Sequence, residues 1–129
     1  MKAILIGATG LVGKALLKEL LLDATYTEVS VLTRRSTQVT HDKLVEELIN
    51  FDQIKTSPIV LKSDVLFSTL GTTLKTAKSK ERQWEIDFEI QFNTAKIASD
   101  SGTKKLVLLS SAGANGKSKV FYSRMKGEL

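Results

Sequence analysis

The sequence has no cysteine, one histidine and one proline among its 129 residues. Without cysteine the chain forms no disulfide, thiolate metal site or thiol nucleophile. A zinc site built on the single histidine, His41, would need unusual carboxylate ligands, so we expect no metal site and interpret His41 as a surface residue. No apolar run approaches the roughly 18 to 20 residues that cross a bilayer, which argues against a membrane-spanning protein.

A secretory leader is also missing, because the apolar stretch within residues 1–7 is too short for a signal peptide. We therefore expect a cytoplasmic protein. With 42% hydrophobic and 26% charged residues, and no repeat or linker, the chain has the composition of a single domain over residues 1–129. Residues 104–129 alone carry an excess equal to the net charge of +5. No aromatic interleaving or nucleic-acid motif accompanies it, so we expect a solvated face and no nucleic-acid partner.

Apolar runs of strand length alternate with amphipathic helical patterns. We expect strands at residues 2–6, 28–33, 44–51, 64–69 and 105–110, and helices at residues 11–22, 79–101 and 122–129. The spacing of residues 44–51 also fits a helix, and Pro58 marks a connection. The alternation predicts an α/β fold, a Rossmann-type doubly wound parallel sheet of order 3-2-1-4-5 with helices on both faces. Its ligand crevice should lie at the carboxyl ends of the first and fourth strands.

The helix expected at residues 79–101 carries an aromatic stripe. Trp84, Phe88 and Phe92 recur at four-residue spacing and so share one face. We predict that this stripe packs against the rest of the protein and is not a platform for a ligand. Ser79 should cap the start of the helix, and Gly102 should follow its end.

Three glycines at three-residue spacing lie between the first strand and the first helix. Gly7 permits a tight turn, Gly10 allows a pyrophosphate to approach the helix N-terminus, and Gly13 allows the helix to pack closely on the sheet. An ordinary strand-to-helix turn is the alternative, but the βαβ context favours a dinucleotide site. The candidate cofactor-binding residues of this turn are Gly7, Thr9, Gly10, Leu11, Val12 and Gly13.

Two arginines follow the second strand, where NAD-binding versions of this motif place an acidic residue for the ribose 2′-hydroxyl. Arg34 and Arg35 supply two guanidiniums and no carboxylate. Because guanidinium groups bind phosphates bidentately, we predict that the cofactor is NADP(H) in preference to NAD(H). The alternative is that one or both arginines simply face solvent.

Two further segments are candidates for the cofactor site. Asp52 follows the third strand and is placed to accept a hydrogen bond from the adenine amino group, although a loop-capping role fits equally well. After the fourth strand, Leu70, Gly71 and Thr72, within the run 69–73, should line the cofactor at the crevice. A plain turn of small residues is the alternative for that run.

A serine, a tyrosine and a lysine follow the fifth strand. Tyr122 and Lys126 are four residues apart and share one helix face. The ammonium group should lower the pKa of the phenol and can hold the nicotinamide ribose, while Tyr122 exchanges a proton with the substrate oxygen. Ser111, or its neighbour Ser110, would hydrogen-bond the same oxygen. Taken alone, the Tyr/Lys pair is a common accident on a helix, and only the order of all these motifs favours catalysis.

Several of these motifs together resemble the short-chain dehydrogenase/reductase superfamily. The resemblance is to its atypical NAD(P)H-binding branch, which includes the Tat-interacting oxidoreductase and bacterial nucleoside-diphosphate-sugar-epimerase-like proteins. The matching segments run the length of the chain: residues 7–13, 70–73, 86–87, 110–114 and 122–129. The Leu-Gly-Thr-Thr and Ser-Ser-Ala-Gly-Ala stretches are the most specific of them.

The resemblance implies a Rossmann fold, bound NADP(H) and a catalytic set of Ser111, Tyr122 and Lys126. The function expected is an NADP-dependent oxidoreductase acting on an unknown small substrate, or else a non-catalytic NADP(H)-binding sensor. A third possibility is a fragment that folds but does nothing alone, because members of this branch continue well past the lysine helix and this chain ends three residues after Lys126. Such a truncated chain could cover its exposed apolar sheet edge by forming a homodimer or by exchanging elements with a second copy.

Overall fold

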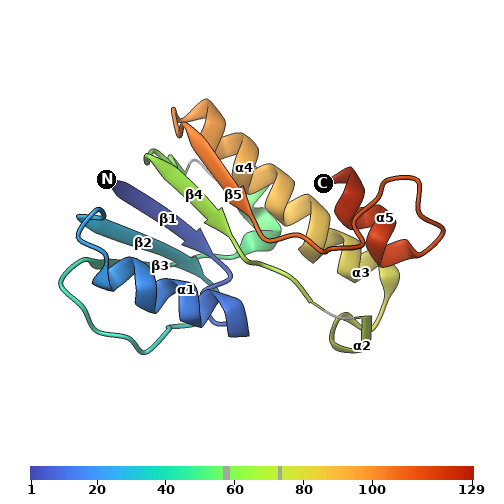
Figure 1. Ribbon diagram of the computed structural model, residues 1–129, viewed down its shortest axis with the longest axis horizontal. Helices are drawn as coiled ribbons and strands as arrows, with labels where there is room; N and C mark the ends of the chain where they lie inside the picture. The colour runs from blue at the N-terminus through green and yellow to red at the C-terminus, as the bar shows by residue number, and fades with distance from the viewer. Residues whose placement is uncertain (57–58, 73) are drawn as a thin grey trace.

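The computed structural model describes residues 1–56, 59–72 and 74–129 of the chain. Pro58, and Thr73 at the end of the run 69–73, lie outside the described residues. Five parallel strands form one sheet: β1 (Lys2–Ile6), β2 (Glu28–Thr33), β3 (Leu44–Leu48), β4 (Val65–Ser68) and β5 (Lys105–Leu108). Their order is β3-β2-β1-β4-β5, with parallel pairing at every edge (Figure 1). The predicted Rossmann-type topology is therefore confirmed.

Helical segments connect the strands. They are α1 (Leu11–Leu22), the 3-10 helix η1 (Phe51–Thr56), α2 (Leu74–Ala77), α3 (Lys80–Trp84), the π-helix η2 (Glu85–Ile90), α4 (Gln91–Asp100) and α5 (Phe121–Glu128). Helix α1 lies on one face of the sheet, and α4 lies on the other (Figure 1). Within the described part of the chain, no helix combines the length and apolarity that a membrane span requires.

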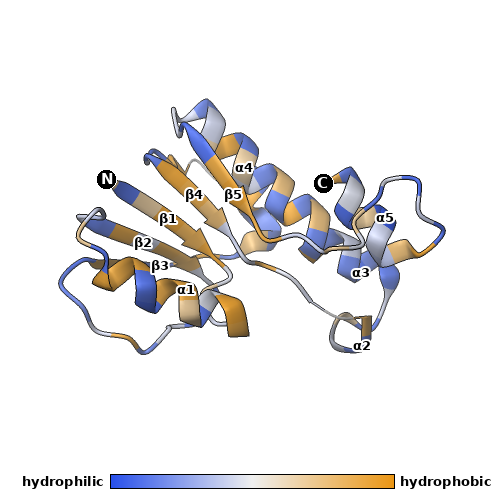
Figure 2. Ribbon diagram, viewed as in Figure 1, coloured by the Kyte–Doolittle hydropathy of each residue, from blue (hydrophilic) through white to orange (hydrophobic). Residues whose placement is uncertain are grey.

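The central strand β1 is buried on both faces, as its apolar sequence predicts. Leu5 packs with Leu17 and Leu21 of α1 in one core cluster. Ile4 and Ile6 point to the opposite face because side chains alternate along a strand, and they pack in a second cluster that includes Ile90. Figure 2 shows the apolar colouring concentrated on these central strands. The two core clusters pack against opposite faces of β1. They therefore fix the position of its carboxyl end, where the glycine turn begins.

Strand lengths differ from the expected ones at the sheet edges. The third strand ends at Leu48 instead of residue 51, because Phe51 begins the 3-10 helix and buries its ring with 4% exposed. Here the Asn50 side-chain oxygen accepts a hydrogen bond from the Asp52 amide at 3.1 Å, which turns the chain out of the sheet. The edge strand β5 is only partly covered by other residues, because Leu106 is 51% exposed and Val107 is 49% exposed.

The structure confirms the helical segment predicted at residues 79–101, including the residues at its two ends. The Ser79 hydroxyl accepts a hydrogen bond from the Arg82 amide at 3.1 Å, and Gly102 adopts a φ of +95° just past the end. Between them, α3, η2 and α4 follow one another without a break in the residue numbering. The π-helical turn of η2 lies in the middle, and such turns often occur at functional sites.

The aromatic stripe of this helix lies outside both core clusters, although it does pack on itself. Trp84 and Phe88 are half-buried and stack with ring centroids 4.2 Å apart, and Phe92 is 51% exposed. The buried positions of this helix are instead mostly polar: Gln83, Asp87, Gln91 and Thr94, beside Ile90 and Ala98. The periodicity of apolar residues misses this, because polar groups are buried where they find partners.

Candidate functional site

The glycine turn has the geometry that its spacing predicts. Gly7 has a φ of +87°, and a Cβ there would lie 2.5 Å from the amide nitrogen of Leu70. A Cβ on Gly13 would collide with the carbonyl oxygen of Gly7, so only glycine lets α1 approach the turn this closely. Gly10 has room around it, since its nearest such contact is 3.6 Å. The two outer glycines thus shape the turn, and the middle one leaves its surface open.

The open surface of this turn is the N-terminus of α1. The first amides of a helix have no partner within it, and they carry partial positive charge. Leu11 is 90% exposed and Val12 46%, so the first residues of this helix lie at the surface. Thr9 lies beside it, half-buried. A pyrophosphate is the kind of group that such exposed amides bind.

The turn is joined to the carboxyl end of β4. The Thr69 hydroxyl donates to the carbonyl oxygens of Ile6 and Gly7, at 3.1 and 3.2 Å. Leu70 follows half-buried and contributes, with Gly7, Thr9 and Phe51, to a small cavity of about 40 Å³. A small cavity therefore lies at the carboxyl ends of β1, β2 and β4, where the ligand crevice is predicted, and Leu70 lines it.

Arg34 and Arg35 line that same cavity from the end of β2. Both are exposed, and among the described residues neither guanidinium forms a hydrogen bond or ion pair. The backbone of Arg35 is held by Thr33, whose hydroxyl donates to its carbonyl oxygen at 2.6 Å. Two guanidinium groups at the mouth of this cavity therefore suit an anionic group.

Asp52 has a different partner from either of those expected. Its carboxylate oxygen Oδ1 forms an ion pair with Nη1 of Arg82 at 2.8 Å, and the same nitrogen contacts Glu85 at 2.7 Å. These two contacts raise the pKa of the Arg82 guanidinium, with the hydrogen bond to Asp52 the larger cause. Asp52 therefore ties η1 to α3, and any contact with adenine would share this carboxylate with Arg82.

Tyr122 and Lys126 lie on one face of α5, as predicted. The Lys126 amine is 5.8 Å from the centre of the Tyr122 ring. It also lies 3.7 Å from Oδ2 of Asp87, and both charged side chains are buried, Asp87 at 0% and Lys126 at 6% exposed. This role of Asp87 does not follow from the apolar periodicity, because Glu85 and Glu89 are acids of the same helical segment. The available signal was the segment 86–87, which is one of those that carry the family resemblance.

Asp87 also holds the segment that follows β4. Its Oδ1 accepts a hydrogen bond from the Thr72 amide at 2.7 Å, and a Cβ on Gly71 would be 3.9 Å from the carboxylate. The other oxygen, Oδ2, has no hydrogen-bond partner among the described residues and faces Lys126 only. One buried carboxylate thus connects the predicted cofactor segment 70–72 with the predicted catalytic lysine.

The electrostatics of this cluster differ from the expectation. Burial is the main cause that raises the pKa of Asp87, and the Lys126 charge and the Thr72 amide oppose it. The pKa of Tyr122 is raised as well, first by burial and second by the Asp87 charge. The expected lowering of the phenol pKa by Lys126 is therefore wrong, because burial and the Asp87 charge both favour the protonated phenol.

The loop before α5 brings Ser111 to the same end of the molecule. A Cβ on Gly127 would collide with the backbone of Asn115 and Gly116, and the Asn115 amide donates to the Ser123 carbonyl at 2.9 Å. Ser111 is half-buried, and its hydroxyl accepts from the Gly113 amide at 3.4 Å. No hydrogen bond joins it to Tyr122 in the described parts of the chain, and its neighbour Ser110 is exposed.

Solved structures share this fold at low sequence identity. UDP-glucose 4-epimerase from Thermotoga maritima superposes with a TM-score of 0.73 and 14% identity, over 99% of this chain and 48% of that one. The oxidoreductase ylbE from Lactococcus lactis gives a TM-score of 0.72 and 21% identity, over 98% of this chain and 59% of that one. These likenesses confirm the Rossmann-type architecture.

Sequence relatives are more similar but longer. The mitochondrial protein fmp52 of Emericella nidulans is 36% identical, over 97% of this chain and 57% of its own length. Protein FMP52 of Meyerozyma guilliermondii, also named mitochondrial, is 38% identical over 100% of this chain and 56% of its own. The chain therefore spans somewhat more than half the length of these relatives.

These names contradict the expectation of a cytoplasmic protein. Fungal relatives from several genera carry the same mitochondrial name. A secretory leader is only one kind of targeting signal, so the expectation that rested on it does not distinguish the cytoplasm from an organelle.

The family model described as the NAD dependent epimerase/dehydratase family matches residues 3–126. With this match, and with the Rossmann sheet and glycine turn in place, the chain is a nucleotide-binding, oxidoreductase-like domain that belongs to the NAD dependent epimerase/dehydratase family.

Proposed function

We propose that this chain is the cofactor-binding domain of an NADP-dependent oxidoreductase acting on a carbonyl or hydroxyl carbon of a small substrate. The observation that carries the proposal is the pair of Tyr122 and Lys126 at the same end of the sheet as the glycine turn, with the amine 5.8 Å from the phenol ring. When bound, the nicotinamide supplies or accepts the hydride. The chain's own residues hold the dinucleotide and move the proton.

Each group in the site has a defined task under this proposal. The amides of Leu11 and Val12 bind the pyrophosphate, and Arg34 with Arg35 binds the 2′-phosphate. Lys126 holds the ribose, and Tyr122 exchanges a proton with the substrate oxygen. The other candidates support these groups: Ser111 at the substrate oxygen, and Leu70, Gly71 and Thr72 along the cofactor.

Calorimetric titration of the 129-residue chain with NADPH and NADH tests the cofactor half of the proposal. We expect NADPH to bind more tightly, and Arg34→Ala to weaken NADPH by about tenfold or more while NADH changes little, since only NADPH carries the phosphate. Lys62→Ala, which removes an exposed lysine elsewhere, is the matched control. Equal binding of both nucleotides to wild type and to Arg34→Ala would overturn the NADP preference.

Reduction of a panel of carbonyl compounds by NADPH tests the catalytic half. Tyr122→Phe should abolish turnover and leave NADPH binding within about twofold, because the hydroxyl serves the substrate and not the dinucleotide. Identical background rates for wild type and Tyr122→Phe, with NADPH bound by both, would overturn catalysis.

A non-catalytic NADP(H) sensor is the second candidate, and the raised pKa of Tyr122 favours it. Partial burial of this side chain, which is 39% exposed, and the Asp87 charge keep the phenol protonated, so it is a poor base. Difference titration of the phenol absorbance between wild type and Tyr122→Phe isolates this group. A pKa that falls when NADP⁺ is bound supports the enzyme, and one that stays raised supports the sensor.

The relatives' names support a mitochondrial location, which we propose for this chain also. The predicted homodimer remains a prediction, supported by the exposed apolar residues of the edge strand β5, Leu106 and Val107. Size-exclusion chromatography with light scattering tests it directly, and a monomer at all protein concentrations would contradict it.

A further inference from the structure

A second cavity lies beside the dinucleotide crevice, between α1 and the loop that joins β2 to β3. Its volume is about 760 Å³, within the range of small-molecule sites. It meets the crevice only at Ala8, Thr9 and Arg35, which line both. The rest of its lining comes from the outer turns of α1 and from residues 36–41, none of which the proposed cofactor site uses.

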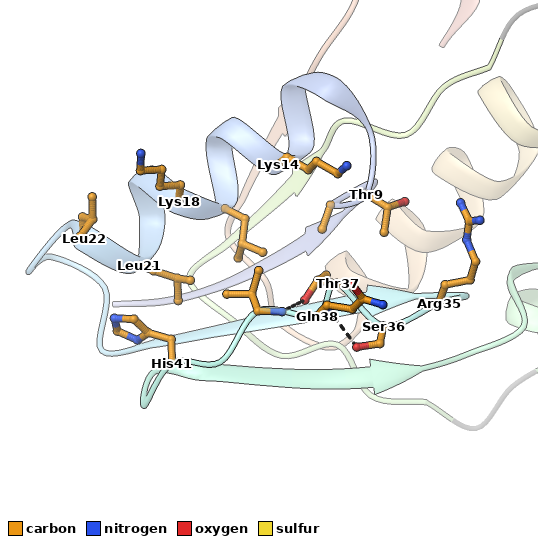
Figure 3. Close-up of a pocket in the computed structure, with 13 residues that line it drawn as sticks. Thr9, Lys14, Lys18, Leu21, Leu22, Arg35, Ser36, Thr37, Gln38 and His41 are labelled. Atoms are coloured by element: carbon orange, nitrogen blue, oxygen red, sulfur yellow. Dashed lines mark hydrogen bonds between the residues drawn. The ribbon is translucent and has the colours of Figure 1, made fainter.

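The charged residues that line this cavity are all cationic. Lys14 and Lys18 lie one turn apart on α1, and Arg35 stands at the end next to the glycine turn (Figure 3). None of the lining residues is acidic, and among the described residues these three cations form no ion pair. Cations that are gathered around a cavity without a carboxylate are suited to a multiply charged anion.

The far end of the cavity is apolar. Figure 3 shows Leu21 and Leu22 together with His41 at the end away from Thr9 and Lys14. Leu22 is 69% exposed and Val39 is 44% exposed, so both present aliphatic surface to the cavity that no other described residue covers. Because this apolar end continues the cationic end, the cavity suits a ligand with a charged head and an aliphatic tail.

The loop that forms the lower wall is held in place before any ligand arrives. The amide and the hydroxyl of Thr37 both donate to Oε2 of Glu46, at 2.9 and 2.6 Å. These bonds lower the pKa of Glu46, so its carboxylate stays charged and bound to the loop. Gln38 adopts a φ of +59°, and its amide donates to the Ser36 hydroxyl at 3.1 Å. The wall therefore does not have to be ordered by the ligand, which favours binding.

We propose that this cavity binds an amphipathic phosphate monoester with a single aliphatic chain. The phosphate lies among Lys14, Lys18 and Arg35, and the chain runs along α1 towards Leu22 and Val39. A dianionic phosphate matches several cations better than a carboxylate does, and the aliphatic chain removes the exposed apolar surface from water.

Calorimetry with a series of alkyl phosphates, from hexyl to decyl and kept below their micelle concentrations, tests the site in the 129-residue chain. We expect saturable binding that strengthens with chain length, by up to about fourfold per CH₂ if the chain is fully buried. Inorganic phosphate and decanol should bind far more weakly than decyl phosphate. Equal binding of inorganic and decyl phosphate would overturn the proposal, and so would equal binding of decanol.

Two variants separate the head from the tail. Lys18→Glu should weaken every member of the series by about tenfold, whereas Val39→Asp should flatten the dependence on chain length. Lys104→Glu, with the same change of charge in an exposed position before β5, is the control and should leave the series unchanged. Loss of affinity in the control equal to that in Lys18→Glu would show a net-charge effect and overturn the assignment.

NADPH titration of the same proteins distinguishes this site from the proposed function. Lys18 and Val39 do not line the dinucleotide crevice, so both variants should bind NADPH as wild type does, within about twofold. Wild type that binds NADPH but no alkyl phosphate overturns this inference and leaves the proposed function standing. Alkyl phosphate binding without NADPH binding supports this inference and overturns the proposed function.

Discussion

The glycine-turn region and the α5 region of the site are built on different physical principles. At the turn, Gly7 and Gly13 let backbone approach backbone, and the groups offered to a ligand are amides and free cations. At α5, two charged side chains, Asp87 and Lys126, are buried against each other. The turn depends on the absence of side chains, and the α5 cluster depends on each partner being present. The two regions should therefore respond differently to substitution.

The largest effect is expected where the buried pair is broken. Asp87→Leu leaves the Lys126 ammonium buried without a partner, which should lower the free energy of unfolding by about 3 to 5 kcal/mol. The double variant Asp87→Leu/Lys126→Met should recover most of that loss, since no charge then remains buried. Urea denaturation measures both. Glu89→Leu, at an exposed acid of the same π-helical segment, is the control and should change stability by less than about 0.5 kcal/mol. A double variant that is no more stable than Asp87→Leu would show that the two charges are not coupled.

The glycine turn should be nearly as sensitive to a single methyl group. Gly13→Ala pushes a Cβ into the Gly7 carbonyl and should cost about 1 to 3 kcal/mol of unfolding free energy. Gly10→Ala meets only an ordinary contact at 3.6 Å and should cost less than about 1 kcal/mol. Thermal or urea denaturation of the two variants compares them directly. Equal stability of Gly13→Ala and Gly10→Ala would contradict the prediction that a steric clash makes position 13 the more sensitive one.

The pH dependence of stability sharpens the contrast, because the turn lacks a buried acid among the described residues and the α5 cluster contains one. The pKa of Asp87 is raised above its ordinary value of 3.8, so the folded protein holds this proton more tightly than the unfolded chain does. The stabilising contribution is fully present below pH 3.8 and is lost as the pH rises through the folded pKa. The difference in unfolding free energy between wild type and Asp87→Asn should therefore shrink as the pH rises. A difference that grows would mean that Lys126 outweighs burial.

The smallest effect is expected at the exposed ion pairs. Arg82→Met removes the contacts to Asp52 and Glu85, whose side chains are about half exposed, and should cost less than about 1 kcal/mol. Lys96→Met, which breaks the exposed pair with Asp100, is a matched control. A loss of 3 kcal/mol or more in Arg82→Met would mean that these exposed ion pairs stabilise the fold as much as the buried pair does.

The sequence alone determines much of the fold and half of the site. Alternating strand and helix patterns predict the five parallel strands and their order, because short connections and right-handed crossovers leave few other arrangements. The spacing of Gly7, Gly10 and Gly13 predicts the turn, since steric clashes are local and depend on residue type. Tyr122 and Lys126 also follow from local spacing, because a helix places residues four apart on one face.

Only the tertiary structure decides the environment of those residues. Asp87 is far from Lys126 in the sequence, and their pairing depends on how α5 lies against η2. Burial of this part of α5, and second the Asp87 charge, raise the pKa of Tyr122, whereas the helix spacing alone suggests the opposite. The buried polar face of the helix and the partner of Asp52 are likewise outside the reach of periodicity. Burial and charge act through space, so their effects depend on which elements of the fold contact one another. Backbone sterics and helix spacing act between residues close in the chain, so they can be predicted from the sequence.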